Sequence, residues 1–327
     1  MALVILVVVS LALGRWATRG LRFRGLFEAL VFRLFAGLAL CSVLILVTGS
    51  ISLRLTQFVM LAAAAAGLAY EVFSETRQEQ SFRQQPRDPF ALVDWACVLA
   101  LVGAATLTFL GASAPATGWD ACVAHLALPM DYAREGRILL WEGNEYSAYP
   151  HLAHVLFAYT FFQGGETSTA WASWLLGMMA WAAAYVLGCR TENRRCGIVA
   201  AAVLATSPIF MDQAGTVSVD LAFCAFALAA LAALMVWYDE RQTGWLLFAA
   251  FLAGSSCGLR HTGYLTCLLM ALGVLLAARE DRIRAAGWFG GCAFAAALPW
   301  LLRSAFLVGN PFFPFFASLL GSGTLPH

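Results

Sequence analysis

Apolar stretches of membrane length follow one another along nearly the whole chain, separated by short polar segments. A helix needs about 20 apolar residues to cross the ~30 Å hydrocarbon core of a bilayer. The first stretch is short, but it lacks the basic start and the cleavage site of a signal peptide. The pattern therefore predicts an all-α, polytopic transmembrane helical bundle with spans over 2–14, 28–49, 55–73, 90–112, 168–189, 196–210, 218–238, 244–258, 262–278 and 286–308.

Arginine placement predicts which loops face the cytoplasm, because basic residues favour that side of a membrane. If the arginine-bearing loops are all cytoplasmic, the long loop over 113–150 is extracytoplasmic. The arginines that set this orientation are Arg15, Arg19, Arg22, Arg24, Arg77, Arg83, Arg87, Arg190, Arg194, Arg195, Arg241, Arg279, Arg282 and Arg284.

The apolar segment from His151 to Gln163 tests this orientation. At 1.5 Å per residue it covers only about 20 Å, which is too short to cross a bilayer. Counting it as a span would move the later arginine clusters to the outer side. We therefore expect a short interfacial or re-entrant helix here.

Composition narrows the function classes. The chain is 61% hydrophobic and 12% charged, with a mean hydropathy of +0.76, which excludes an ordinary soluble protein. All 20 basic residues are arginine, so a P-loop lysine and a Schiff-base lysine are both excluded. No Asp-x-Asp pair is present to hold a metal-bound nucleotide donor. The nine cysteines lie mostly in apolar spans and are interpreted as packing residues.

Candidate chemistry gathers on the predicted outer side. The stretch Gly118 to Tyr149 is the longest polar segment between spans and holds five carboxylates. Ionisable groups near membrane depth are costly and usually functional, so their gathering suggests one site. The carboxylates are Asp120, Asp131, Glu135, Glu142 and Glu145, and the other outer polar residues are Asp212, Asp220, Arg260, Arg303, Asn310 and all five histidines, 125, 151, 154, 261 and 327.

An ordered set of short motifs runs through the second part of the chain: WDACVAHLALPMDYAREGRI (119–138), YSAYP (146–150), VDL (219–221), GLRHTG (258–263), PWLLR (299–303) and GNPFFPF (309–315). In this order they resemble bacterial polyprenyl-phosphate-sugar-dependent glycosyltransferases of the GT-C superfamily, which include protein O-mannosyltransferase-like and aminoarabinose transferase-like enzymes. The resemblance implies N-terminal helices and a cytoplasmic loop over 1–89, a GT-C-like catalytic core over 90–316 with an extracytoplasmic loop 113–167 bearing short juxtamembrane helices, and a C-terminal tail over 317–327. Because the last span ends facing outward, a further C-terminal part is expected.

The resemblance assigns Asp120 as the catalytic base. Phosphate departs as a stable anion, so one base for the acceptor hydroxyl and one cation for the phosphate are sufficient. The alternative for Asp120 is a helix N-cap. Arg260 stands where the family usually has lysine and would hold the phosphate; its alternative is an arginine that snorkels from a helix end. Arg303 is a second phosphate candidate.

The remaining candidate substrate-binding residues are His261, Asp220, His125, Asn310 and Tyr146. Asp220 equally suits a helix N-terminus, and His125 equally suits a packing role. Asn310 sits where a helix ends, and Tyr146 equally suits the aromatic belt of a membrane interface, as do Trp119, Trp141 and Tyr149.

A metal site built from Asp120, His125, His151 and His154 is a minority hypothesis, because tight ligand spacings are absent and the resemblance implies no metal or other cofactor. Two residues depart from the family pattern. Ala121 follows Asp120 where a second acid is common, and Met130 replaces a common basic residue. Either change alters the substrate or marks an inactive copy.

The expected function is transfer of a sugar from a polyprenyl phosphate to an extracytoplasmic glycan, lipid or protein by an inverting displacement. The expected location is the bacterial inner membrane, with the site facing the periplasm or exterior, membrane lipid as a partner and no nucleic-acid partner. Three alternatives remain: a transporter or lipid flippase, a polysaccharide polymerase or ligase, and an inactive homologue. The charges at span ends and the lack of a visible repeat disfavour a transporter.

Overall fold

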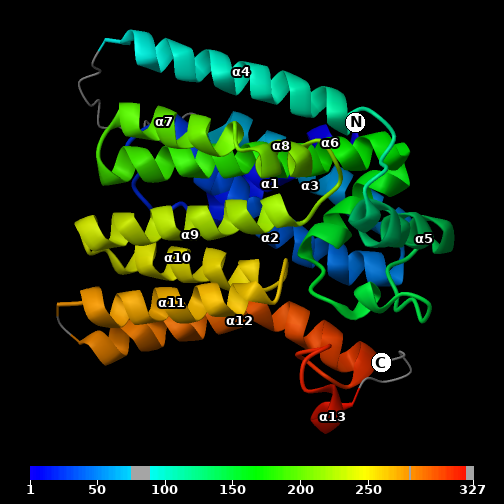
Figure 1. The fold of residues 1–327 in the computed structure, drawn as a ribbon. Coiled ribbons are helices and arrows are strands. Elements are labelled where there is room, and N and C mark those ends of the chain that lie inside the picture. The colour runs from blue at the N-terminus through cyan, green and yellow to red at the C-terminus, as the bar shows by residue number, and fades with distance from the viewer. Residues whose placement is uncertain (75–88, 280, 322–327) are drawn as a thin grey trace.

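The computed structural model describes residues 1–74, 89–279 and 281–321, and these form helices joined by turns, with no strand among them (Figure 1). Among them, six helices are long and apolar enough to cross a membrane, or seven if one bent pair counts as a span. The elements are α1 (Ala2–Ala17), α2 (Leu26–Ile51), α3 (Leu53–Ser74), α4 (Leu92–Ala112), η1 (Ala121–His125), α5 (Ala127–Glu135), η2 (Glu145–Ala148), α6 (Leu152–Thr191), α7 (Arg194–Ala205), α8 (Pro208–Ala214), α9 (Asp220–Glu240), α10 (Thr243–Ser256), α11 (Thr262–Ala277), α12 (Arg282–Val308) and α13 (Ala317–Leu320).

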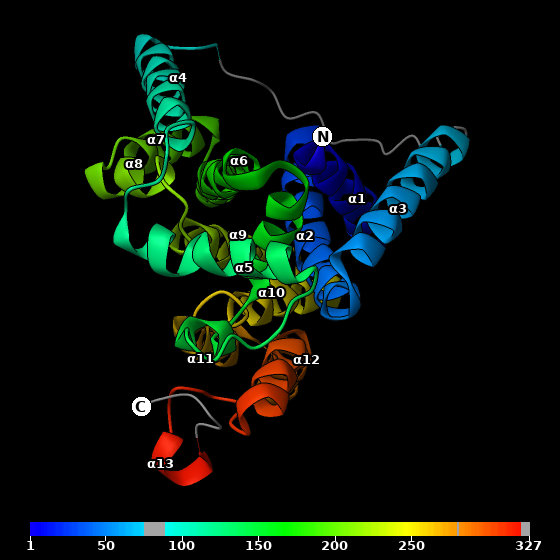
Figure 2. The ribbon, with the colours of Figure 1, turned by 90° about the vertical axis from the view of Figure 1, so that its right-hand side faces the viewer.

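The long helices lie side by side, and the loop with α5 closes one end of the bundle (Figures 1 and 2). Most of them are apolar around their whole circumference, as expected of helices that face either packed neighbours or lipid. α9 is largely buried between its neighbours α6 and α10. α4 instead leaves Leu99, Val102 and Leu110 largely exposed, and this surface would face lipid tails. The predicted all-α polytopic bundle is confirmed.

Contacts place the arginine-bearing loops together at one end of the bundle. Arg190 donates to Glu28 Oε1 (3.1 Å from Nε) and to Glu240 Oε1 (3.0 Å from Nη1), which joins three helix ends. Arg195 pairs with Asp94 at 3.1 Å. Arg77, Arg83 and Arg87 lie outside the described residues, as does His327.

The loop over 113–150 lies at the opposite end. Ile138 donates its amide to the Gly49 carbonyl at 2.8 Å, and Leu53 donates to Gly136 at 2.7 Å, so the loop contacts the turn between α2 and α3. The two groups of loops therefore occupy opposite ends, as the arginine pattern predicts. Which end faces the cytoplasm stays a prediction.

α6 is broken near its start. Gly165 has φ 63° and ψ −157°, a conformation that suits glycine, and it separates residues 152–164 from the part that crosses the bundle. Both ends of the first part lie at the loop end, because Leu152 bonds to Gly258 and the Ala116 amide donates to Glu166 Oε1 at 2.8 Å. This segment therefore does not cross, in agreement with the interfacial or re-entrant helix expected for 151–163.

One predicted span is bent. The apolar stretch 196–210 is not a single helix, because α7 ends at Ala205 and α8 continues at an angle of 72°. Pro208 is the physical reason: it opens α8 and disfavours helical backbone at the residue before it, and Ser207 is extended (φ −62°, ψ 127°).

The turn between α10 and α11 is recessed. α9 has 21 residues and α10 only 14; α9 ends and α10 begins at the arginine-rich end. At 1.5 Å per residue the two helices extend about 31 Å and 21 Å from that end. The turn over 257–261 therefore lies roughly 10 Å deeper than the start of α9.

Candidate active site

Asp120 directly precedes the π-helical turn η1, which leads the loop into α5. Such widened turns are rare and are frequently found at functional sites. Ala121 and Ala124 are buried against the bundle, while the Asp120 carboxylate is exposed. Asp120 occupies the N-cap position of η1, but its side chain makes no cap hydrogen bond. Its carboxylate is free to meet a substrate.

His125, at the end of η1, lies close to both Asp120 and Arg260. Burial lowers the pKa of His125 to about 4; the Asp120 charge partly opposes this shift, and the Arg260 charge adds to it. His125 is consequently neutral near pH 7. The residues Asp120, His125 and Arg260, from two distant parts of the chain, thus share one region at the loop end.

Asp220 and Arg260 form an ion pair through Oδ1 and Nη1. Asp220 is the first residue of α9, and its amide donates to Ser218 Oγ at 3.1 Å. Arg260 stands in the recessed turn and extends outward to reach the carboxylate. Their side chains are 44% and 46% exposed, so Arg260 has open solvent beside it. Because Asp220 holds the Arg260 side chain in place, Arg260 differs from an arginine that only snorkels from a helix end.

Three histidines form a buried series beneath the loop. His125 Nδ1 lies 3.0 Å from His154 Nε2, and the His154 ring stacks on His151 with centroids 4.6 Å apart. His151 Nε2 lies 2.8 Å from the Tyr132 hydroxyl on α5. The Arg303 guanidinium lies near the Tyr132 hydroxyl, and its charge partly opposes the rise in the pKa of Tyr132 that burial causes. Sequence reasoning missed Tyr132; the spacing of His151 and His154 was the available signal.

A metal centre is not formed by these histidines. Within the described ranges, no group of three or more His, Cys, Asp or Glu residues is placed to hold a metal ion. The physical reason is that His125 and His154 bond to each other and His151 bonds to Tyr132. These contacts use one ring nitrogen of each histidine, while Nδ1 of His151 and Nδ1 of His154 are buried without a hydrogen-bond partner. No third ligand joins them among the described residues, so the minority metal hypothesis lacks support.

Arg303 and Asn310 are both buried under the loop. Arg303 donates to the Ser147 carbonyl at 2.6 Å and to the Tyr149 carbonyl at 3.4 Å, so it ties α12 to η2. Asn310 is fully buried; its amide donates to the Phe315 carbonyl at 2.8 Å, which stabilises the turn after α12. Asn310 is therefore used by the turn rather than facing the open part of the site.

His261 and Tyr146 lie at the edge of the region. His261 Nε2 bonds to the Phe313 carbonyl at 2.8 Å, and burial lowers its pKa. Tyr146 packs its ring against Tyr149, with centroids 5.2 Å apart. Ala121 is 1% exposed, so the family's second acid would have no solvent-facing place at this position.

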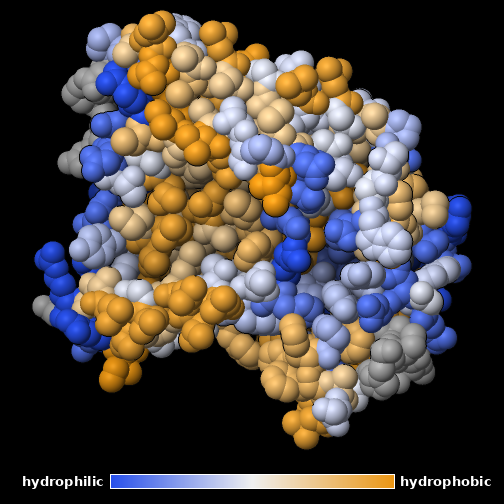
Figure 3. Space-filling view, in the orientation of Figure 1, coloured by the Kyte–Doolittle hydropathy of each residue, from blue (hydrophilic) through white to orange (hydrophobic). Residues whose placement is uncertain are grey.

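Hydrophilic side chains gather at the loop end of the molecule, next to a hollow in the apolar front surface over α9 and α10 (Figure 3). Residues 152–302 match the dolichyl-phosphate-mannose-protein mannosyltransferase family. The matched segment runs from the start of α6 into α12 and includes Asp220 and Arg260, while Asp120 and His125 precede it. Neither the curated proteins nor the solved structures gave a match.

Proposed function

We propose that this chain, whose residues 152–302 belong to the dolichyl-phosphate-mannose-protein mannosyltransferase family of GT-C membrane glycosyltransferases, transfers a sugar from a polyprenyl phosphate to an acceptor at the loop end of the bundle. One observation carries the proposal. The charges of Asp120 and Arg260 both act on His125 although the two residues are distant in sequence, and Arg260 pairs with Asp220.

Asp120 accepts the proton of the acceptor hydroxyl in this mechanism. The acceptor oxygen forms a bond to the anomeric carbon of the sugar from the side opposite the phosphate. The bond from that carbon to the phosphate oxygen breaks, and the electron pair leaves with the phosphate. The sugar configuration is inverted, and no second carboxyl is needed to protonate the leaving group.

Arg260 holds the phosphate. Its guanidinium can donate two parallel hydrogen bonds to phosphate oxygens, and Asp220 orients it. The positive charge opposes the negative charge that develops as the phosphate leaves. The recessed turn favours this role, because it brings Arg260 toward the depth at which a membrane lipid carries its phosphate.

His125 supports the base rather than replacing it. Burial keeps its pKa at about 4, so it adds no positive charge that would pair with Asp120 near pH 7. Asp120 therefore keeps its charge available for the acceptor proton.

The test is consumption of a lipid-linked donor. Purified protein in phospholipid nanodiscs is incubated with a panel of radiolabelled polyprenyl-phosphate sugars, with membrane extract as a source of acceptor. We expect label to leave the lipid fraction for one donor, and the Arg260→Gln variant to bind that donor more weakly. If neither consumption nor saturable binding of any donor is observed, the proposal fails.

A further inference from the structure

An apolar groove runs between α2 and α12, beside the start of α6. It consists of two adjoining cavities of about 500 Å³ and 530 Å³. Val43, Val47, Ala295 and Pro299 line both of them, so the two cavities form one continuous groove.

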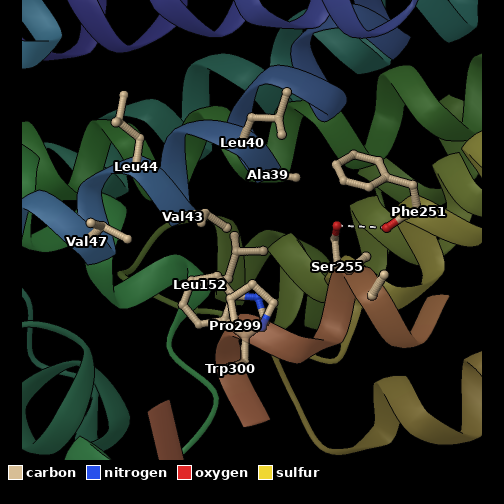
Figure 4. Close-up of a pocket in the computed structure, with 12 residues that line it drawn as sticks. Ala39, Leu40, Val43, Leu44, Val47, Leu152, Phe251, Ser255, Pro299 and Trp300 are labelled. Atoms are coloured by element: carbon tan, nitrogen blue, oxygen red, sulfur yellow. Dashed lines mark hydrogen bonds between the residues drawn. The ribbon is translucent and has the colours of Figure 1, made fainter. Parts of the chain in front are cut away.

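The deeper part of the groove enters the protein (Figure 4). Its inner wall is made by Leu152 of α6, by Phe251 and Ser255 of α10 and by Trp300 of α12. The Ser255 hydroxyl donates to the Phe251 carbonyl at 2.8 Å, so it offers no free donor to an occupant. This lining suits a hydrocarbon chain and would hold water poorly.

The shallower part opens toward the membrane. Val47, Leu302 and Phe306 line it and are 60%, 45% and 84% exposed, so lipid can enter from the side. Arg303 is the only charged residue that lines either described cavity, and it lies toward the loop end of α12.

The Arg303 charge is buried without an acid partner among the described residues. Its side-chain partners are the Ser147 and Tyr149 carbonyls and the Tyr132 hydroxyl, all of them neutral. A buried guanidinium without an anion is costly, and it is stabilised when an anionic group binds beside it. A groove for an apolar chain with such a cation at its end fits an anionic lipid.

A packed wall separates this groove from Arg260. The Leu152 amide donates to the Gly258 carbonyl at 2.7 Å. Trp300 lies so close to Gly258 that an added Cβ would be 2.3 Å from the indole nitrogen. This packed contact lies between the deeper part of the groove and the turn that carries Arg260.

Resting on the proposed function, we infer that the α2–α12 groove holds the apolar anchor of the acceptor, and that the acceptor is a lipid whose anionic group lies beside Arg303. The donor phosphate is the leaving group, so it must lie near the base. The charges of Arg260 and Asp120 both act on His125, which places these two residues in one region. Arg303 contacts Tyr132 at the other end of the histidine series. The position of Arg303 suits a phosphate that remains part of the acceptor lipid throughout the reaction.

The first experiment detects the lipid without activity. The full chain in nanodiscs is labelled with a long-chain alkyl phosphate that carries a diazirine in its chain, and the labelled peptides are identified. We expect α2 and α12 to be labelled, and Val43→Trp, which fills the groove, to reduce this labelling at least about tenfold, as for loss of one good contact. Leu268→Trp, on a lipid-facing surface of α11, is the matched control and should change nothing.

Arg303→Gln tests the charge. We expect it to reduce labelling by the alkyl phosphate and to leave labelling by the corresponding alkyl alcohol unchanged. Because Arg303 also holds the loop, Val43→Trp stands as the independent variant. Labelling of α2 and α12 no stronger than that of exposed α11 overturns the site.

The second experiment assigns the lipid to the acceptor. Val43→Trp should retain binding of the radiolabelled polyprenyl-phosphate sugar and lose transfer to lipid. Loss of donor binding in this variant overturns the acceptor assignment, because the groove would then hold the donor. Groove labelling in a chain that neither binds nor consumes any donor shows a lipid site and overturns the transferase itself.

Discussion

Asp220, at the start of α9, and Arg260, in the turn before α11, are 40 residues apart and form an ion pair at the loop end of the bundle. The pair exists because α10 is seven residues shorter than α9, so the turn stays deep and the arginine extends outward to meet the acid. Since both side chains are about half exposed, the pair contributes little to stability and leaves the guanidinium open to a ligand.

Arg260→Gln should therefore weaken donor binding while leaving folding intact. We expect the free energy of unfolding to change by less than about 1 kcal/mol, as for an exposed ion pair. Donor Kd should rise about tenfold or more, because a charge-assisted bond to phosphate is lost. Thermal unfolding in detergent and donor titration measure the two effects. Arg260→Lys should recover part of the affinity, and a Gln variant with wild-type donor affinity would contradict the assignment.

Stability should decrease as the pH falls from about 6.5 toward 4, because His125 has a lowered pKa in the folded protein. The sign follows from proton binding: the folded-state pKa is about 4 and the ordinary value is 6.5. Between these values the unfolded chain binds the proton and the folded chain does not, so acid favours unfolding. The full contribution is present above pH 6.5.

The measurement is the unfolding temperature from pH 4 to pH 8 for wild type and His125→Gln. The glutamine keeps a hydrogen-bonding side chain but does not titrate in this range. Its curve should be flatter below pH 6.5. Two parallel curves would show that His125 does not cause the acid sensitivity.

Tyr132→Phe should destabilise the protein. The Tyr132 hydroxyl is fully buried and bonds to His151 at 2.8 Å, and its removal leaves a buried nitrogen without a partner. Such a loss costs about 1–3 kcal/mol. Tyr238→Phe is the matched control, since Tyr238 is 47% exposed and should tolerate the change. Equal unfolding temperatures for the two variants would contradict a structural role for the histidine series.

Arg190→Met should strongly destabilise the bundle at its other end. Arg190 is 1% exposed and bonds to Glu28 and Glu240, so its loss leaves the Glu28 carboxylate nearly buried without a cation. Breaking such a pair costs about 3–5 kcal/mol. Arg284→Gln removes an exposed arginine and should have almost no effect. Equal yields and unfolding temperatures of the two variants would contradict this expectation.

The helices and the grouping of their ends could be predicted from sequence, because apolar length and arginine placement depend on each segment alone. The end of α7 at Ala205 was missed, although Pro208 marks it, because the apolar run continues across the bend. The burial of Arg303 and Asn310 could not be predicted, since it depends on how the loop folds back over α12. The same path of α5 brings Tyr132 to His151, two residues 19 apart with no local signal for the contact.

The sequence also could not predict that the Asp120 side chain makes no cap hydrogen bond. A position before an apolar turn favours a cap, and sequence alone left capping and catalysis as equal in pattern. In the structure Asp120 is exposed and its side chain makes no cap hydrogen bond, so its carboxylate is accessible, and its catalytic role stays a prediction.

The rate of donor consumption by Asp120→Asn tests the central claim most directly. The variant keeps the size of the side chain and removes the base, so the rate should fall about 10²–10⁴-fold while donor binding is retained. Glu142→Gln, an exposed acid in the same loop, should keep the wild-type rate. Donor consumption by Asp120→Asn at the rate of the wild type would contradict the account.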